Sequence, residues 1–295
     1  MTILITGSNG LLGQKIVAQL LKSGVNFIAT SIGKNRNPNC PEINYESLDI
    51  TSLLEVEQIF DRIQPNVVIN TAAMTNVDSC EDDKLNCRKI NVDAVQFLFN
   101  SCKKRKSHFI HLSTDFVFDG ESGPYAENDE RNPLGVYAKS KVDSEDILLK
   151  DEYLNWTILR TIIVFGEGEN LSRSNIVLWA KSALAEGSEL SIVNDQFRSP
   201  TWADDLAWAC VEAANSKTRG VFHISGPETF SIYELVIRVA KYYGFNTSNI
   251  KQVSSLALNQ KAKRPPKTGF NIAKARKFLG YQPMSFEESL SRLTN

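Results

Sequence analysis

Short apolar runs alternate with amphipathic segments over residues 1–165. The apolar runs are rich in β-branched residues, as expected of parallel strands that are covered on both faces. The segments between them repeat apolar residues at intervals of three and four, which is the spacing of a helix that buries one face. Strands are predicted at residues 2–6, 26–31, 66–70, 107–113 and 156–161, and helices at 11–22, 52–63, 84–102 and 136–150.

This alternation predicts βαβ units and therefore a Rossmann-type, doubly wound parallel sheet of the α/β class. Thr51 is the candidate N-cap of the helix at 52–63, because hydroxyl side chains accept hydrogen bonds from the first helical amides. Beyond residue 165 the pattern becomes irregular. We expect a dinucleotide-binding domain at residues 1–165, to which 204–224 return, and a smaller, irregular α/β substrate-binding lobe at 166–203 and 225–295.

The irregular part of the chain still carries local signals. Pro265 and Pro266 lie in KAKRPPKTG, and this composition predicts a loop over residues 261–269. The remaining predicted elements are helices near 176–186, 204–215, 232–243, 272–279 and 286–293, and strands at 190–193 and 221–224.

Charge excludes one class of partner. The 33 Lys and Arg nearly balance the 34 Asp and Glu, so there is no electrostatic footprint for nucleic acid. The one basic run, residues 103–106, is expected to be a solvated helix end. No apolar run approaches the roughly 18 residues of a membrane span, and the opening MTILITGSNG does not resemble a secretory signal. A cytoplasmic protein is therefore expected.

Cysteine and histidine usage gives no sign of a metal site. The five cysteines are odd in number and include no CxxC pair, which favours reduced thiols. His108 and His111 lie three apart in a predicted strand and therefore point to opposite faces. The sequence thus predicts no bound metal.

A glycine-rich turn joins the first strand to the first helix. Gly7, Gly10 and Gly13 have the spacing GxxGxxG. Gly7 permits a tight turn, Gly10 lets the backbone approach a pyrophosphate, and Gly13 lets the helix pack on the strand. The helix N-terminus supplies free N–H groups for the phosphates. A dinucleotide site is predicted here, and it includes the turn residues Asn9, Leu11 and Leu12.

The end of the second strand indicates which nicotinamide cofactor is preferred. An acidic residue there would bind the ribose 2′-hydroxyl of NAD, but the strand ends at Ser31 without a carboxylate. Lys34 and Arg36 follow and are placed to meet a 2′-phosphate. NADPH is therefore the predicted cofactor, with NADH left as an alternative.

The candidate catalytic residues are Thr114, Tyr137 and Lys141. Tyr137 and Lys141 lie four residues apart on a predicted helix, so they share one face. A neighbouring ammonium is expected to lower the pKa of Tyr137 and make it a usable acid. Thr114 ends the fourth strand, at the edge of the sheet that lines the ligand crevice, and is placed to donate a hydrogen bond to a carbonyl that also faces Tyr137.

These motifs in this order resemble the extended short-chain dehydrogenase/reductases, and within them the dTDP-4-dehydrorhamnose reductase family. The resemblance runs from Met1 to about Tyr281, and LSTDFVFDG and DQFRSPTWADDLA are its most specific segments. The other matching segments are TGSNGLLG, NTAAMTNVDSCE, NPLGVYAKSK, ILRTIIVFG, GVFHISGPETFSIYEL and KARKFLGY.

The resemblance implies hydride transfer from NAD(P)H to C4 of a nucleotide-linked 4-keto-6-deoxy sugar, as in the making of dTDP-L-rhamnose. Tyr137 would protonate the developing alkoxide, Lys141 would tune Tyr137 and bind the nicotinamide ribose, and Thr114 would polarise the keto group. The helix with Asn91 would flank the site, and the enzyme would be a monomer or a homodimer. Further cofactor contacts are implied at Asp49, Ile50, Ala72 and Ala73, and substrate contacts at Thr75, Thr114, Asp115, Phe116, Tyr137, Gln196 and Arg198.

Two positions depart from the family pattern and leave the substrate open. Met74 stands where members often have histidine, and Ile163 stands where they often have an aromatic residue. Three alternatives therefore remain: another enzyme of the superfamily, such as an epimerase; a reductase of an unlinked carbonyl; and a non-catalytic subunit resembling the regulatory subunit of methionine adenosyltransferase. A dehydratase is less favoured, because Phe116 follows Asp115 where a dehydratase usually has a second carboxylate.

Overall fold

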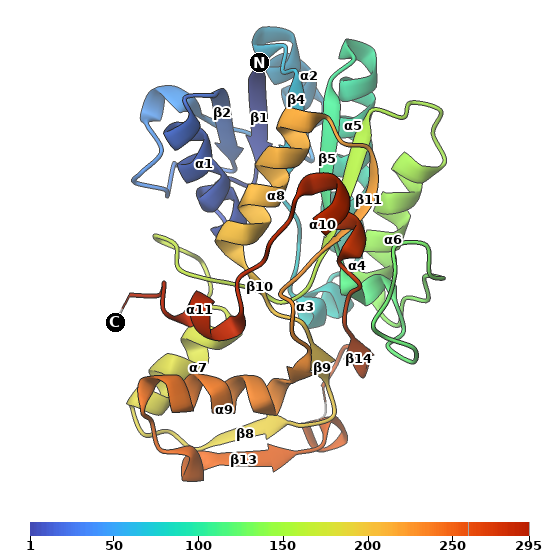
Figure 1. Cartoon of the computed structure of the whole chain (residues 1–295). Helices are drawn as coiled ribbons and strands as arrows, with labels where there is room; N and C mark the ends of the chain where they lie inside the picture. Colours follow the sequence, from blue (N-terminus) through green and yellow to red (C-terminus); the bar gives the residue numbers. More distant parts are fainter. Residues whose placement is uncertain (259, 295) are drawn as a thin grey trace.

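The computed structural model describes residues 1–258 and 260–294. Its centre is a seven-stranded sheet in the order β11-β6-β5-β4-β1-β2-β3, and every neighbouring pair is parallel. The sheet confirms the predicted Rossmann-type α/β fold (Figure 1). The strands are β1 Thr2–Thr6, β2 Asn26–Ser31, β3 Tyr45–Ser47, β4 Val67–Asn70, β5 His108–Thr114, β6 Trp156–Thr161 and β11 Gly220–Ile224.

Helices cover both faces of this sheet, as a doubly wound fold requires. On one face, α1 (Leu11–Ser23), α8 (Ala203–Ser216) and α10 (Ala273–Leu279) contribute to one apolar core. On the other face, α2 (Leu53–Ile63), α5 (Ala94–Arg105) and α6 (Val136–Leu149) contribute to a second core. Because both faces are buried, the central strands are almost free of exposed residues, which explains their continuous apolar runs.

The predicted helix at 84–102 is confirmed in position but has a different internal geometry. It consists of α4 (Lys84–Arg88), a π-helical turn η2 (Lys89–Asp93) and α5. A π turn often occurs at a functional site, because the extra residue re-aims a side chain. A short helix, α3 (Val77–Asp82), precedes it and was not predicted.

The predicted cap of α2 was wrong by one residue. The Ser52 hydroxyl accepts a hydrogen bond from the amide of Glu55, so Ser52 is the N-cap. The Thr51 hydroxyl instead donates to Asp49 Oδ1 over 2.8 Å. Thr51 is unavailable because Asp49 forms a local turn that takes both its amide and its hydroxyl.

The second lobe has an apolar core of its own. It contains α7 (Ile176–Ala185), α9 (Ile232–Tyr243), α11 (Phe286–Leu290) and the parallel pair β8 (Leu190–Val193) and β13 (Ile250–Val253). Figure 1 shows this lobe beyond the edge of the sheet toward which β1 runs. Its remaining elements are β7 Val164–Phe165, β9 Phe197–Arg198, β10 Thr201–Trp202, β12 Phe230–Ser231, β14 Lys267–Thr268, η4 Thr247–Asn249 and η5 Ser255–Leu258, and the first lobe adds η1 Glu42–Asn44 and η3 Asp115–Val117.

The prediction of a continuous loop at 261–269 was wrong at its end. Lys267–Thr268 forms β14, which pairs in parallel with β9. The pairing partner lies about 70 residues earlier in the chain, so no local signal could reveal it.

Residues near the C-terminus return to the first lobe. Phe270, Ile272, Ala275, Leu279 and Tyr281 belong to the core between the sheet and α8. The predicted division of the chain into domains stays a prediction, but this packing places 270–281 with the sheet. No helix of the described chain combines the length and the apolarity that crossing a bilayer takes.

Candidate active site

The glycine turn lies at the end of β1 and has almost no room for side chains. Gly7 has a φ of +74°, and a Cβ there would lie 2.7 Å from the amide nitrogen of Ala72. A Cβ on Gly13 would lie 2.5 Å from the carbonyl oxygen of Gly7. Gly10 is different: its backbone is extended, it is exposed, and the nearest atom to a Cβ is at 3.3 Å. Gly7 and Gly13 are therefore required by the fold, whereas Gly10 leaves the surface of the turn bare.

The start of α1 fits a dinucleotide phosphate. Gly10 is the N-cap and offers no side-chain hydrogen bond, so the first amides of α1 lack a capping acceptor. The hydroxyl of Ser8 is buried and has no hydrogen-bond partner among the described residues. Donors without partners at a positive helix end suit an anionic group.

The loop that carries the predicted 2′-phosphate ligands is tied to the glycine turn by Asn9. Its side-chain amide donates to the carbonyl of Lys34 over 2.9 Å, and its Oδ1 accepts from the amide of Arg36 over 2.8 Å. Asn9 is 1% exposed and holds this loop, and its role as a direct cofactor ligand stays a prediction. The side chains of Lys34 and Arg36 are exposed beside the end of β2 at Ser31.

The other predicted cofactor residues lie along the same edge of the sheet. Ala72 and Ala73 follow β4, and Ala72 touches the Gly7 turn. Asp49 and Ile50 follow β3, beside the end of β2. One oxygen of Asp49 accepts hydrogen bonds from Thr51, so part of its carboxylate already has a structural role.

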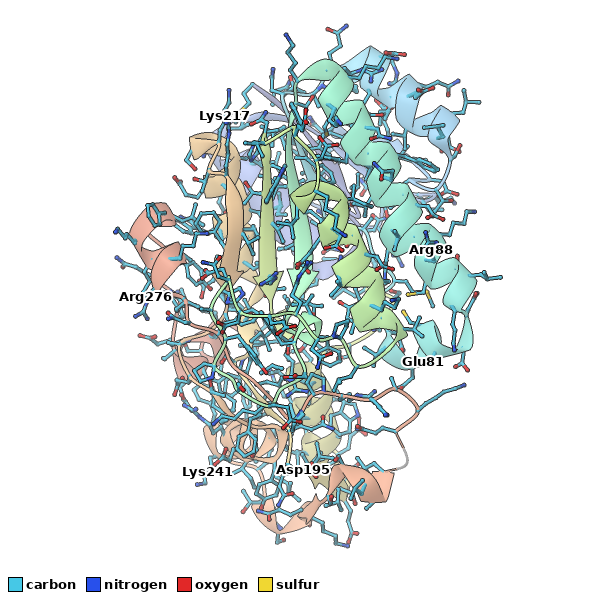
Figure 2. All side chains as sticks on the ribbon, turned by 90° about the vertical axis from the view of Figure 1, so that its right-hand side faces the viewer. Glu81, Arg88, Asp195, Lys217, Lys241 and Arg276 are labelled. Carbon is cyan, nitrogen blue, oxygen red and sulfur yellow. The ribbon has the colours of Figure 1, made fainter. Side chains whose placement is uncertain are left out.

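The first turn of α6 carries Tyr137 and is fixed from outside the helix. Glu81 of α3 accepts a hydrogen bond from the amide of Val136 over 2.8 Å. Figure 2 shows Glu81 beside the lower end of α6, with Lys217 above it at the top of the molecule. Further along α6, the buried Glu145 forms a two-pronged pair with Arg160 of β6, with both distances 2.8 Å. These contacts orient the helix against the sheet.

The surroundings of Tyr137 correct the prediction of a lowered pKa. Burial raises the pKa of Tyr137, and the nearby carboxylate of Asp115 raises it further, while a hydrogen bond with Thr114 and the charge of Arg173 only partly offset this. The Lys141 ammonium turns toward β5 and lies 3.2 Å from His111 Nε2. Tyr137 thus keeps its proton at neutral pH.

Lys141 is the buried cation of the site, with 2% of its surface exposed. Burial lowers the pKa of Lys141 to about 8, against the opposing effect of Glu145 and Cys87. Lys141 and Tyr137 share one face of α6, as predicted from their spacing. Thr114 is the third residue of the predicted catalytic set. It ends β5 and lies close to Tyr137.

Asp115 and Arg198 do not present free charges to a substrate. Asp115 Oδ1 accepts from the hydroxyl of Thr114 over 3.0 Å, and Oδ2 accepts from Thr268 and lies 3.6 Å from Arg198 Nε. The terminal nitrogens of Arg198 donate to the carbonyls of Phe197, Pro265 and Pro266. Both side chains are at most 4% exposed. Buried charges need partners within the protein. The direct substrate contacts of Asp115 and Arg198 stay a prediction.

The remaining predicted substrate residues lie at the junction of the lobes. Thr75 accepts a hydrogen bond from Arg173, which comes from the second lobe. The ring of Phe116 lies edge-on to Tyr137, with the ring centres 6.1 Å apart. Gln196 is 6% exposed and donates to Gln260. These roles remain predictions.

Sequence reasoning missed Arg173 and placed Asn91 only on a helix beside the site, without a role of its own. Arg173 brings a cation close to Tyr137, but its loop gave no pattern to signal this. Asn91 in the π turn holds Met74 by both backbone groups and donates to Ser140 of α6. The sequence did carry a signal for this role of Asn91, because it is a polar residue on the buried side of an amphipathic helix. Ile163, the second departure from the family pattern, has a φ of 36° and lies between the two cores.

Comparison with known proteins places the chain among sugar-nucleotide enzymes. The family model described as RmlD substrate binding domain matches residues 1–295. A dTDP-4-dehydrorhamnose reductase of Aggregatibacter actinomycetemcomitans is 31% identical over 99% of this chain and 97% of its own length. The crystal structure of a dTDP-4-dehydrorhamnose reductase from Bacillus anthracis in complex with NADP has a TM-score of 0.84 at 26% identity, covering 99% of this chain and 98% of that one.

A third relative is named as a subunit of another enzyme and not as a reductase. Methionine adenosyltransferase 2 subunit beta of Danio rerio is 30% identical over 89% of this chain and 80% of its own length. Similarity over most of the chain is therefore shared by reductases and by a subunit of another enzyme.

Proposed function

The chain belongs to the RmlD substrate binding domain family, and from this premise we propose that it is an NADPH-dependent reductase of a nucleotide-linked 4-keto-6-deoxy sugar. The observation that carries the proposal is the grouping of Thr114, Tyr137 and Lys141 at the sheet edge that also holds the glycine turn. The reductases among its relatives, one of them in complex with NADP, support it.

The glycine turn, the start of α1 and the loop at Lys34 and Arg36 would hold the dinucleotide, which supplies a hydride when bound. The chain's own part in the reaction is proton transfer. As the sugar C4 carbonyl gains electrons, Tyr137 donates its proton to the carbonyl oxygen. The Thr114 hydroxyl would turn its proton from Asp115 Oδ1 to the same oxygen and stabilise the charge that develops there. The raised pKa of Tyr137 keeps the donor protonated before the step.

Lys141 supplies the balancing charge. When Tyr137 has given up its proton, the positive charge of Lys141 on the same helix face stabilises the tyrosinate that remains. Lys141 is also the side chain that we assign to the nicotinamide ribose. Arg173 lies close to Tyr137 at the junction of the lobes. We assign its guanidinium to the diphosphate of the sugar nucleotide.

The second candidate function is that of a non-catalytic subunit, and the similarity to methionine adenosyltransferase 2 subunit beta favours it. The complete set of Thr114, Tyr137 and Lys141 supports the reductase instead. The deciding experiment measures oxidation of NADPH with a panel of dTDP-, GDP- and UDP-linked 4-keto-6-deoxy sugars. Turnover of at least one is expected. No turnover, together with tight binding to a methionine adenosyltransferase catalytic subunit, would favour the second function.

The cofactor preference gives a separate prediction. We expect NADPH to bind more tightly than NADH by about 1–2 kcal/mol, because Lys34 and Arg36 offer charge-assisted contacts to the 2′-phosphate at an exposed site. Dissociation constants from nicotinamide fluorescence test this. Replacing Lys34 and Arg36 together by alanine should remove the preference, whereas Lys22→Ala at the far end of α1 should leave it intact. Equal affinities in the wild-type protein would contradict the assignment.

A further inference from the structure

Lys141 is a buried ammonium with an unusual partner. None of the ion pairs among the described residues includes it, and its side chain makes one polar contact, 3.2 Å to His111 Nε2. A buried cation is stable only where a hydrogen-bond acceptor faces it. His111 is therefore the group that decides where the Lys141 ammonium lies.

His111 is held from both sides of its ring. Nε2 lies 3.0 Å from the hydroxyl of Ser144 on α6, and Nδ1 lies 3.2 Å from the side-chain amide of Asn70, which ends β4. The Asn70 amide also lies 2.6 Å from the hydroxyl of Thr6, and Thr6 directly precedes the Gly7 turn. A continuous set of buried polar contacts thus joins Lys141 to the strand end that carries the dinucleotide site.

We propose that His111 is a positioning residue, which accepts a hydrogen bond from the Lys141 ammonium through Nε2 and aligns it with the glycine turn. The inference rests on the function proposed above, since the alignment matters only if Lys141 serves the cofactor and Tyr137. It assigns a role to a buried histidine that the reaction itself does not use.

The chemistry of imidazole suits this task. Burial and the nearby charge of Lys141 hold the pKa of His111 well below its ordinary value, so the ring stays neutral. A neutral acceptor fixes the ammonium without cancelling its charge, whereas a carboxylate at this position would neutralise it. In the accepting tautomer Nδ1 carries the proton. The Asn70 amide must then be turned so that its oxygen accepts from Nδ1 and its NH₂ group donates to the Thr6 hydroxyl.

The contact should also set the ionisation of Lys141. The titratable groups that act on Lys141 are Glu145 on α6 and Cys87 on α4, and His111 faces it from β5. Without the acceptor at His111, the charged form of Lys141 loses its partner and its pKa falls below about 8. A property that needs the ammonium is present below this pKa and is lost as the pH rises through it. In a variant without His111, the alkaline limb of such a property must therefore move to lower pH.

The test uses three variants and binding of NADPH as a function of pH, without any sugar. His111→Leu should move the alkaline limb of NADPH affinity down by about one pH unit, a tenfold change in the ionisation of Lys141. His111→Gln, which retains an acceptor, should restore most of the wild-type limb. The matched control is His108→Leu, because His108 is also buried in β5 but contacts Asn155 and Thr157 on the opposite face. It should lower stability and leave the limb in place.

Nitrogen NMR of the His111 ring gives a second readout that needs neither cofactor nor substrate. We expect an unprotonated Nε2 in the wild-type protein, and a change in its shift in Lys141→Met. Two results would overturn the proposal. One is an alkaline limb of NADPH affinity that His111→Leu leaves at the wild-type pH. The other is a protonated Nε2 whose chemical shift does not change in Lys141→Met. If His111→Leu does not fold, the alkaline limb of His111→Gln and the chemical shifts of the His111 ring nitrogens test the proposal instead. A wild-type protein that binds no NADPH would instead refute the proposed function, while the ring nitrogens still test the contact.

Discussion

Tyr137→Phe is expected to lower the rate of sugar reduction by about 10²- to 10⁴-fold, the usual loss when a general acid is removed. The substitution deletes one hydroxyl and leaves the ring, which contacts Phe116, in place. Folding and NADPH affinity should therefore stay close to wild type. Single-turnover rates with a reducible 4-keto nucleotide sugar, with thermal unfolding and NADPH titration beside them, measure all three properties.

Lys141→Met is the companion variant, and pH separates it from Tyr137→Phe. In the wild-type protein, the group with a pKa of about 8 is charged at lower pH, so kcat/KM should fall as the pH rises through this value. Lys141→Met should lose that limb and also bind NADPH more weakly, because Lys141 has both roles. Phe116→Leu, which changes a neighbouring ring without removing a proton donor, is the control. Unchanged reduction in Tyr137→Phe would show that the proton comes from another group.

Gly10→Val is expected to abolish measurable NADPH binding while the protein still folds. The extended backbone of Gly10 accepts any residue, and its position is exposed, so the fold tolerates a side chain there. A branched side chain at the N-cap of α1 would occupy the space in which the phosphates approach the helix amides. Equilibrium binding and urea unfolding of the same sample distinguish the two effects.

Two further glycine variants show whether the loss is local. Gly10→Ala adds one methyl group and should weaken binding less than valine does. Gly13→Val should instead destabilise the whole fold, because its side chain would meet the backbone of Gly7 and Ser8 within 2.5 Å. Normal NADPH affinity in Gly10→Val would mean that the phosphates bind elsewhere.

Much of the first lobe followed from the sequence because its signals are local. Alternating apolar runs and amphipathic helices are set by neighbouring residues, so β1, β2 and β6 were predicted with their observed bounds. The spacing of Tyr137 and Lys141 predicted a shared helix face for the same reason. The second lobe was harder: short strands such as β9 and β14 exist only because distant segments pair.

The charges of the site were decided by the tertiary structure. The sequence by itself determined the fold class and the glycine turn, and it supplied Thr114, Tyr137 and Lys141 as candidate catalytic residues, because each depends on residue type and spacing along the chain. It did not determine that Arg198 is buried against Asp115, that Lys141 turns to His111, or that burial raises the pKa of Tyr137. Burial and the partners of a charged group come from segments far apart in the sequence, and these set its ionisation.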